Sequence, residues 1–132
     1  MNSSDKKIIA VSPAGMKMDH LFLTSFHVAG FSYYQGSFLF SELKIGSRIE
    51  LVPDTNNIHD EYAVEVRFNG NKIGYVPRSD NCEISTILKA GHNIFIGVIQ
   101  QISPIEHPEQ QVRIGVFVTR NTETTQASPD AL

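Results

Sequence analysis

The fold is decided by residues 46–78, which read GSRIELVPDTNNIHDEYAVEVRFNGNKIGYVPR. Two short apolar runs, 49–52 and 63–68, flank a polar connection at 54–61 with the sequence DTNNIHDE. Asn and Asp favour turns because their side chains hydrogen-bond to nearby backbone and tolerate left-handed conformations. A turn needs only one or two such residues, and this connection holds more. We therefore treat it as a candidate site between two strands.

The alternating pattern continues on both sides of this connection. Residues 62–68 alternate between apolar and polar side chains, and the dipeptide Asn69-Gly70 that follows is a strong hairpin signal. The partner strand is expected over 71–76, where Pro77 ends it because proline cannot donate to a ladder. Upstream, a strand over 48–52 is expected to end at Pro53.

Three further strands are expected over residues 21–30, 93–102 and 111–118, from strand-like apolar runs. Residues 37–46 are expected to form a short helical turn or loop, and their dense apolar side chains to plug an open end of a barrel. The sequence therefore predicts an all-β fold, an OB-like or SH3-like six-stranded β-barrel. One short helix is inserted between its late strands.

That helix is expected over 81–90. Asp80 and Glu83 have the spacing of a capping box. An apolar stripe follows at helical spacing and ends at Leu88, and Gly91 stands where a helix commonly stops. Cys82 falls within this helix, where we expect a small thiol that faces the core.

Composition limits the class of protein. The 132 residues and the hydrophobic fraction of 41% fit one domain. We expect this domain at 21–118, between a flexible N-terminal arm (1–20) and a disordered C-terminal tail (119–132). One cysteine excludes an internal disulfide and a Cys-based zinc site. No apolar run reaches about 18 residues and no secretory signal is evident, which predicts a cytoplasmic protein without a membrane span.

The formal net charge of −3 argues against a protein that coats nucleic acid through charge alone, because such proteins are usually basic. A compact site that grips one strand end through a few contacts is compatible with this charge.

An aromatic segment, FSYYQG, occupies residues 31–36. Adjacent residues of an extended chain point to opposite sides, so Tyr33 and Tyr34 are not both expected to face the core. One packs inward and the other presents its ring at the surface. The exposed ring is either a stacking platform or a half-buried ring that packs against loops.

Four motifs in this order resemble the HIRAN domain family. They are the segment FHVAG at 26–30, the pattern YYxG at 33–36, the pattern NxxDxxAVxV at 57–66 and the segment GYVPR at 74–78. The resemblance runs from about residue 21 to about residue 118. It implies an OB-like β-barrel, no catalysis, and recognition of the 3′ end of single-stranded DNA. Separately, the sequence predicts no cofactor or metal.

The resemblance also implies roles for individual residues. Tyr33 matches the aromatic residue on which a terminal base stacks. Asn57 and Asp60 match polar residues at the 3′-hydroxyl pocket, where Asp60 accepts a hydrogen bond from the hydroxyl. Tyr75 and Arg78 match polar or basic positions near the backbone phosphates. The full set of expected nucleic-acid-binding residues is Tyr33, Tyr34, Asn57, His59, Asp60, Tyr75 and Arg78.

Two positions depart from the family pattern. Ser32 stands where the DNA-binding members have an arginine, and His59 where they have a second tyrosine. These departures predict weakened affinity and leave the fold unaffected. HIRAN domains occur alone in bacteria and phages, and fused to Swi/Snf-class helicases and ubiquitin ligases in eukaryotes. The resemblance therefore implies a role in DNA repair, replication or a mobile element, with a helicase or nuclease as a partner protein.

The polar connection has other interpretations. Asn57 and Asp60 are alternatively caps for the backbone of the loop, as in Asx-turns. A calcium loop is rejected because His59 holds the position that needs glycine. A zinc site lacks further histidines at ligand spacing. No nucleophile elbow or phosphate loop supports an enzyme. A protein-interaction module without nucleic-acid binding is the remaining alternative, and its affinity would change little with salt.

Overall fold

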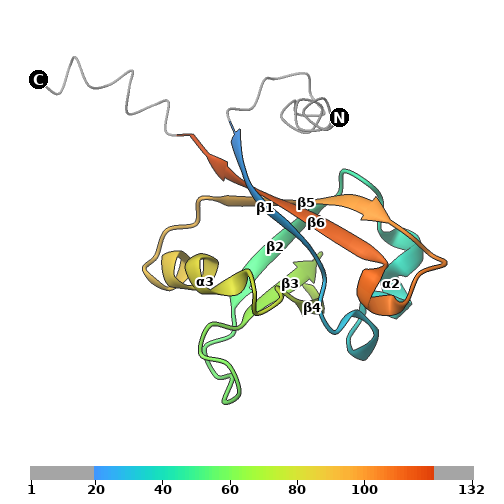
Figure 1. The fold of residues 1–132 in the computed structure, drawn as a ribbon, viewed down its shortest axis with the longest axis horizontal. Helices are drawn as coiled ribbons and strands as arrows, with labels where there is room; N and C mark the ends of the chain where they lie inside the picture. The colour runs from blue at the N-terminus through green and yellow to red at the C-terminus, as the bar shows by residue number, and fades with distance from the viewer. Residues whose placement is uncertain (1–19, 121–132) are drawn as a thin grey trace, which may run out of the picture.

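The computed structural model describes residues 20–120. Six antiparallel strands form one sheet with the order β1-β6-β5-β2-β3-β4 (Figure 1). The strands are β1 (His20–His27), β2 (Arg48–Pro53), β3 (Val64–Phe68), β4 (Asn71–Tyr75), β5 (Phe95–Ile102) and β6 (Val112–Thr119). All six expected strands are present with slightly shifted ends, so the all-β prediction is confirmed. The expected arm and tail lie, apart from residues 20, 119 and 120, outside the described residues.

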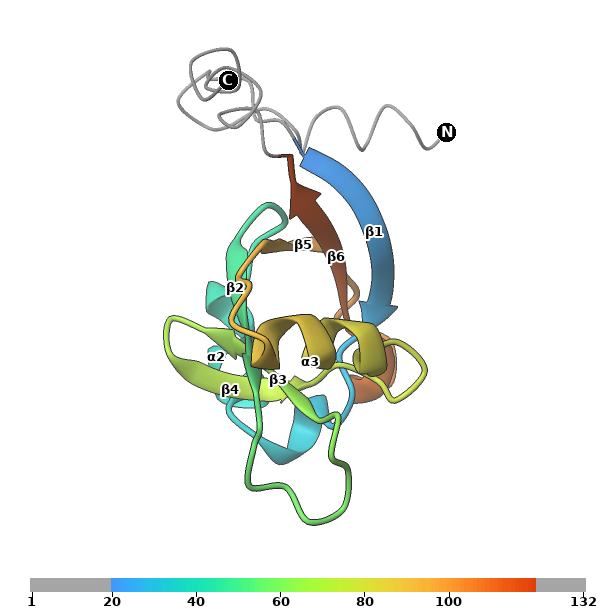
Figure 2. The same cartoon turned by 90° about the vertical axis from the view of Figure 1, so that its left-hand side faces the viewer.

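The helices are short. The main one is α3 (Asn81–Lys89), between β4 and β5 as expected, and it contacts β2 and β3 (Figure 2). The others are η1 (Phe31–Tyr33), α2 (Gly36–Leu39), η2 (Phe40–Glu42) and η3 (Pro108–Gln110). α2 and η2 lie where a short helical turn or loop was expected, whereas η1 and η3 lie in segments expected to be extended chain and loop.

The predicted capping box at the start of α3 is wrong. Asp80 stands at the N-cap, but its side chain makes no capping hydrogen bond. Its carboxylate instead accepts hydrogen bonds from Thr24 Oγ1 at 3.1 Å and from Ser79 Oγ at 2.9 Å. A contact with β1 therefore replaces the local cap.

The prediction for Cys82 is also wrong, because this thiol is exposed. The helix buries Asn81, Ile84 and Ser85. Successive helical residues are rotated by about 100°, so the face that carries Ile84 turns Cys82 outward. Leu88 completes the inner face and packs, half-buried, against the core.

The predicted hairpin joins β3 and β4 through Asn69 and Gly70, which have φ angles of 50° and 82°. Its register contains a bulge, since Val66 pairs with Gly74 and Arg67 with Lys72. One extra residue on β4, Ile73, therefore lies between two regular pairs. A single inserted residue reverses the alternation of side chains along a strand.

The two edge strands meet at one bridge. After β1 the backbone N–H and C=O of Ala29 exchange hydrogen bonds of 2.8 Å with those of Tyr75. The approach is tight, because a Cβ on Gly74 would lie 2.3 Å from Val28 Cγ1 and 2.5 Å from the Ala29 oxygen. Within residues 20–120, the hydrogen bonds thus show one sheet with a single bridge between its edges, and full closure into an OB-like barrel stays a prediction.

The core combines buried side chains of the strands with Phe31 of η1, with Leu43 and with Ile84 of α3. The alternation of the strand runs and the apolar stripe of the helix predict seven core residues, of which Val64, Val66, Ile73, Ile84 and Val98 are buried. Leu88 and Ile96 are only half-buried.

The expected apolar plug at 37–46 is partly wrong. Phe38 and Ile45 are 82% and 67% exposed, while Leu43 alone is fully buried. Phe40 packs edge-on against Phe31, with ring centroids 6.1 Å apart.

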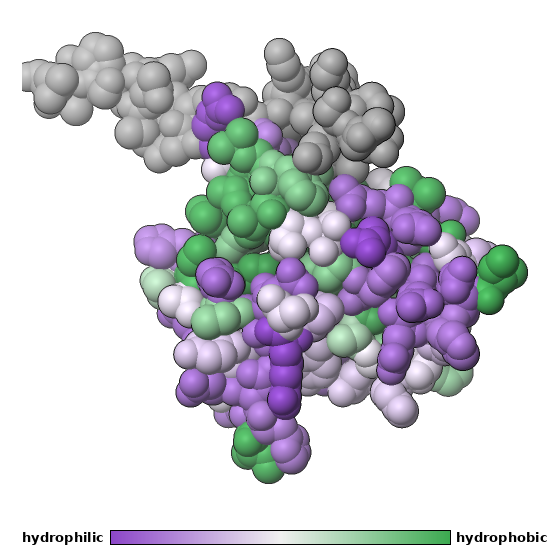
Figure 3. All heavy atoms as spheres, in the orientation of Figure 1, coloured by the Kyte–Doolittle hydropathy of each residue, from purple (hydrophilic) through white to green (hydrophobic). Residues whose placement is uncertain are grey.

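The two ends of the molecule differ in polarity. Figure 3 shows an apolar area around the start of β1 and the end of β6, where Leu21 and Leu23 are about half exposed. The opposite end of the molecule is mostly hydrophilic. Within residues 20–120, no helix has the length and hydrophobicity needed to cross a membrane.

Candidate nucleic-acid interface

The connection between β2 and β3 projects from the hydrophilic end of the molecule (Figures 1 and 2). Its shape is held by Asn57. The Asn57 side-chain oxygen accepts hydrogen bonds from the backbone N–H groups of His59 at 2.8 Å and Asp60 at 3.0 Å. Its amide nitrogen donates to Asp54 Oδ2 at 3.2 Å. Asn57 thus has the turn-stabilising role that the sequence left open, with one amide hydrogen unused.

Asp60 is fixed in place by three neighbours. Its Oδ1 accepts a hydrogen bond from the backbone N–H of Tyr62 at 2.9 Å, and its Oδ2 accepts one from Asn81 Nδ2 at 2.9 Å. Arg78 Nε lies 3.6 Å from the same Oδ2. The Tyr62 backbone hydrogen bond, followed by Asn81 and the Arg78 charge, lowers the pKa of the Asp60 carboxyl despite partial burial. An ionised carboxylate has about four acceptor sites, so Asp60 keeps capacity for a further donor.

The guanidinium of Arg78 remains largely accessible to a ligand. One of its terminal nitrogens donates to the backbone oxygen of His59 at 3.2 Å, and the side chain is 74% exposed. Because the guanidinium carries five N–H donors, most of them face solvent. His59 itself is exposed, beside the exposed Ile58 at the tip of the loop.

The Tyr75 side chain, in contrast, already has hydrogen-bond and ring partners within the domain. Its hydroxyl donates to Asp54 Oδ2 at 2.7 Å and accepts from Lys72 Nζ at 3.2 Å. Its ring meets the ring of Tyr34 edge-on, with centroids 5.6 Å apart. Burial, followed by the hydrogen bond to Asp54, raises the pKa of Tyr75, and the same bond is the main cause of the lowered pKa of Asp54. Tyr75 therefore supports the loop through Asp54.

Lys72 is a basic residue of this site that the sequence did not indicate. Its ammonium lies 4.5 Å from the centroid of Tyr34, 5.0 Å from that of Tyr75 and 3.7 Å from Glu65 Oε2. Burial acts to lower the pKa of Lys72, but the Tyr75 hydrogen bond and the Glu65 charge outweigh it and raise the pKa. The bulge at Ile73 brings Lys72 and Tyr75 to the same side of β4.

Tyr33 and Tyr34 divide as expected. Tyr33 is 78% exposed, whereas Tyr34 is half-buried against Tyr75. The backbone reason differs from the expected one, since these residues lie in and just after the turn η1 and not on extended chain. Gly30 precedes η1 with a φ of +70°. A Cβ at this position would lie 3.3 Å from the ring of Tyr34 and 3.9 Å from the ring of Tyr33.

Six of the seven expected site residues are therefore joined by direct contacts. The chain of contacts runs from Tyr34 through Tyr75, Asp54 and Asn57 to the backbone of His59 and Asp60, and from Asp60 to Arg78. Tyr33 adjoins this group at Gly30. Asn81 and Lys72 belong to it as well, and neither has a local motif that would have revealed it.

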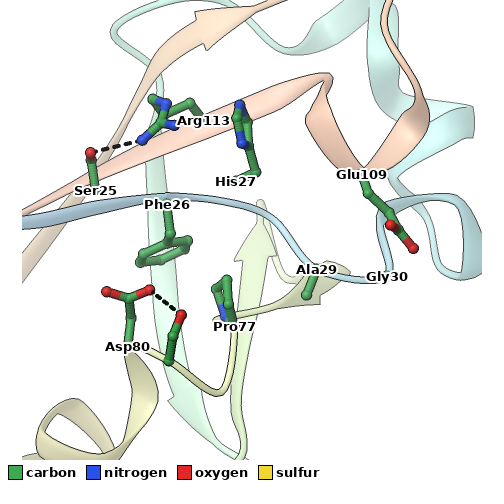
Figure 4. Close-up of a pocket in the computed structure, with 10 residues that line it drawn as sticks. Ser25, Phe26, His27, Ala29, Gly30, Pro77, Asp80, Glu109 and Arg113 are labelled. Carbon is green, nitrogen blue, oxygen red and sulfur yellow. Dashed lines mark hydrogen bonds between the residues drawn. The ribbon is translucent and has the colours of Figure 1, made fainter.

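A cavity of about 450 Å³ lies beside this group (Figure 4). It is lined by Ser25, Phe26, His27, Ala29, Gly30, Pro77, Ser79, Asp80, Glu109 and Arg113. Gly30 connects it to the tyrosines, and Pro77 and Ser79 flank Arg78 in the chain. Burial, followed by the charge of Arg113, lowers the pKa of His27 in its wall.

The charges of the site limit its chemistry. A carboxylate such as Asp60 repels a phosphate but accepts a hydrogen bond from a hydroxyl, whereas the Arg78 guanidinium attracts phosphate. The exposed Tyr33 ring offers a face for stacking. Among residues 20–120, no group of three or more His, Cys, Asp or Glu side chains is placed to hold a metal ion.

These features define a mainly-β domain that carries an aromatic, basic and carboxylate-bearing site at one end of its sheet. The chain belongs to the HIRAN domain family, whose pattern it matches over residues 21–119.

Solved structures show the same fold. A protein from Lactobacillus plantarum superposes with a TM-score of 0.66 at 19% identity, covering 77% of this chain and 97% of that protein. The HIRAN domain of human HLTF superposes with a TM-score of 0.60 at 21% identity, covering 85% of this chain and 88% of that domain. Comparison with curated protein sequences finds no match.

Proposed function

We propose that this chain is a non-catalytic module that binds single-stranded DNA and recognises its 3′-hydroxyl end. The family assignment supports a nucleic-acid-binding role. The observation that carries the finer proposal is the position of Asp60, a lowered-pKa carboxylate held between Asn81 and Arg78. A carboxylate at this place accepts from a free hydroxyl and repels the added charge of a terminal phosphate.

The neighbouring side chains supply the remaining contacts. Tyr33 provides a stacking surface that suits any base, because every base has a π-face. Arg78 attracts the last phosphates. Tyr34, Tyr75 and Asn57 act mainly by fixing the shape of the site, since their contacts are with one another and with Asp54.

The affinity is expected to be weak. Ser32 offers no cation, and His59 offers a smaller ring than tyrosine. Lys72 lies against Tyr34 and Tyr75, and its positive charge partly compensates for the cation that is missing at position 32. A cytoplasmic role in DNA repair, replication or a mobile element, beside a helicase or nuclease, is consistent with such a module.

End recognition is tested with labelled oligothymidines that differ only in a free or 3′-phosphorylated end. The unmutated chain should bind the free end more tightly, and Asp60→Asn should remove that preference. Glu61→Gln is the matched control, because it removes the adjacent negative charge and should keep the preference. Equal binding of both ends by the unmutated chain would show that Asp60 is only a structural cap.

The exposed Ile58, 89% accessible at the tip of the loop, favours a second candidate function, a protein-interaction module. The dependence of binding affinity on salt concentration distinguishes these two candidate functions. Phosphate contacts predict that affinity falls as salt rises, whereas an apolar protein interface is nearly insensitive to it. Absence of oligonucleotide binding at low salt would favour the interaction module.

A further inference from the structure

The tip of the β3–β4 hairpin has a chemistry that the proposed function does not use. Asn69 is the only asparagine of the 132-residue sequence that is followed by glycine. The side-chain carbonyl carbon of an asparagine can be attacked by the backbone nitrogen of the next residue, and a Cβ on that next residue obstructs the approach. Gly70 has no Cβ, so its nitrogen can approach closely. The dipeptide therefore has the local sequence for an intramolecular reaction of the carboxamide.

The fold leaves both reacting groups free. Asn69 and Gly70 are exposed, and a Cβ added at Gly70 would meet no atom within 4 Å. The Gly70 N–H has no acceptor among residues 20–120, because the pair that closes the hairpin is Phe68 with Asn71. Within the same residues, Asn69 accepts a side-chain hydrogen bond only at its backbone oxygen, so its carboxamide is free as well. Solvent can therefore reach both the carboxamide and the nitrogen that would attack it.

The turn that carries these groups is weakly held. Both central residues have positive φ angles, 50° and 82°, as in a type I′ turn. Asn71 Nδ2 lies 3.4 Å from the Asn69 oxygen, and Arg67 Nη1 lies 3.5 Å from the Gly70 oxygen. Both distances are longer than those of a strong hydrogen bond. The tip also adjoins β4, an edge strand of the sheet, so its local opening costs less than unfolding of the domain.

Other asparagines of the domain lack this combination. The side chain of Asn57 is hydrogen-bonded at both its oxygen and its nitrogen. Asn81 is buried, and its nitrogen is hydrogen-bonded. The residues that follow these two, an isoleucine and a cysteine, both have a Cβ. Asn71 is exposed like Asn69 but precedes Lys72, so it is an internal control for the effect of the glycine.

We propose that Asn69 is a site of spontaneous deamidation in the folded chain. The Gly70 nitrogen forms a bond to Asn69 Cγ, the Cγ–Nδ2 bond breaks, and the proton from the Gly70 nitrogen leaves with Nδ2 as ammonia. Water then opens the cyclic imide. Cleavage between the Gly70 nitrogen and Cγ gives aspartate, and cleavage between that nitrogen and the Asn69 backbone carbonyl carbon gives isoaspartate. No group is oxidised or reduced, and water is the only other reactant.

The two products affect the hairpin differently. Aspartate at this position keeps the main chain unchanged and adds a carboxylate to the turn that Arg67 already contacts. Isoaspartate adds one carbon to the main chain of the turn, and the length of the turn fixes the register of the hairpin. That register, with its bulge, places Lys72 against Tyr34 and Tyr75. The isoaspartate product therefore disturbs one wall of the candidate interface.

The test incubates the full folded chain at mildly alkaline pH, where base removes the proton from the attacking nitrogen more readily. Trypsin then cuts after Arg67 and Lys72 and releases the peptide FNGNK. Mass spectrometry should find aspartate and isoaspartate in place of Asn69 and no change at Asn71, and digestion of an unincubated sample gives the background. Asn69→Gly suits a positive φ and has no carboxamide, so this variant should release no ammonia from the turn.

The synthetic peptide FNGNK gives the rate of the reaction without the fold. Conversion in the folded chain should be within about tenfold of this rate, since a tenfold slowing corresponds to about 1.4 kcal/mol for opening the turn. Two outcomes would overturn the proposal. One is a folded chain in which Asn69 stays intact while the peptide converts fully, because the turn would then hold the groups apart. The other is equal conversion at Asn71, which would show that exposure alone decides the reaction.

The effect on the hairpin has a separate readout. The incubated chain is fractionated into its two products, and urea unfolding of each is compared with that of Asn69→Asp, which has the aspartate product by synthesis. The aspartate fraction should match Asn69→Asp, and the isoaspartate fraction should unfold at a lower urea concentration. Equal midpoints for the two fractions would reject the effect on the hairpin. None of these measurements depends on DNA binding, so the inference stands or fails independently of the proposed function.

Discussion

Asn81 Nδ2 donates a 2.9 Å hydrogen bond to Asp60 Oδ2, and this contact joins the start of α3 to the polar loop 21 residues earlier in the chain. Asn81 is buried, with 3% of its surface exposed. The helix thus fixes the carboxylate that the proposed function needs. Without this contact, only loop contacts and the exposed Arg78 would orient Asp60.

The first prediction concerns this hydrogen bond. Asn81→Ala removes the donor and leaves Asp60 less well satisfied, which should lower the free energy of unfolding by about 1–3 kcal/mol. Urea denaturation measures the loss, and Thr86→Ala, at an exposed position of the same helix, is the control. An unchanged urea midpoint for Asn81→Ala would show that the contact adds no stability.

The second prediction concerns stacking. Tyr33→Ala should weaken binding of single-stranded DNA by about 1–3 kcal/mol whatever the terminal base, because stacking uses the face of the ring. Phe38→Ala removes an equally exposed ring, 82% accessible, that lies outside the site. Fluorescence titration should show no loss for Phe38→Ala. Equal effects of the two variants would argue against a specific role for Tyr33.

The third prediction concerns phosphate attraction. Arg78→Ala should weaken every oligonucleotide and reduce the dependence of log K on log salt by about one unit for each phosphate that the variant no longer binds. Arg48 is exposed on β2, away from the loop, and Arg48→Ala is the matched control. The expectation fails if the two variants have the same salt slope.

The fourth prediction concerns the bridge between the sheet edges. A Cβ at Gly74 would lie 2.3 Å from Val28 and 2.5 Å from the Ala29 oxygen, so Gly74→Ala must displace the bridge. We expect a loss of about 1–3 kcal/mol from overpacking. Gly91 also has a positive φ but nothing within 4 Å of an added Cβ, so Gly91→Ala reports backbone strain alone. Similar thermal midpoints for both variants would contradict a close approach at Gly74.

The fifth prediction concerns acid stability. Hydrogen bonds lower the pKa values of Asp54 and Asp60 in the folded chain below their ordinary value of 3.8. Each carboxylate therefore contributes stability that is present above about pH 4 and is lost as pH falls through the folded pKa. Urea unfolding at neutral and acid pH should show this loss, and Asp54→Asn and Asp60→Asn should reduce it. Glu50→Gln, on an exposed position of β2, should leave the loss unchanged.

Local sequence determined much of the fold. The alternating runs and the Asn69-Gly70 turn predicted β3 and β4 almost to the residue, because a two-residue hairpin fixes its own register. The helix at 81–90 was predicted from its apolar stripe. Sequence also indicated the polar loop, since its excess of Asn and Asp exceeds what a turn needs.

Tertiary structure decided how these elements meet. The bulge at Ile73 places Lys72 beside Tyr75, and alternation alone would separate them onto opposite faces. Asp80 binds Thr24 of β1 in place of capping its own helix. Such contacts join residues far apart in the chain, and the sequence carries no local pattern for them.

What the sequence alone determined is therefore the set of strands, the hairpin and the polar loop, because each depends on neighbours within a few residues. What only the tertiary structure decided is the orientation of the site: Asn81 against Asp60, Tyr75 against Asp54, and the cavity beside His27. These contacts and this cavity form between segments that are far apart in the chain. Packing between the elements, such as the close approach of Gly74 to Val28 and Ala29, therefore decides them.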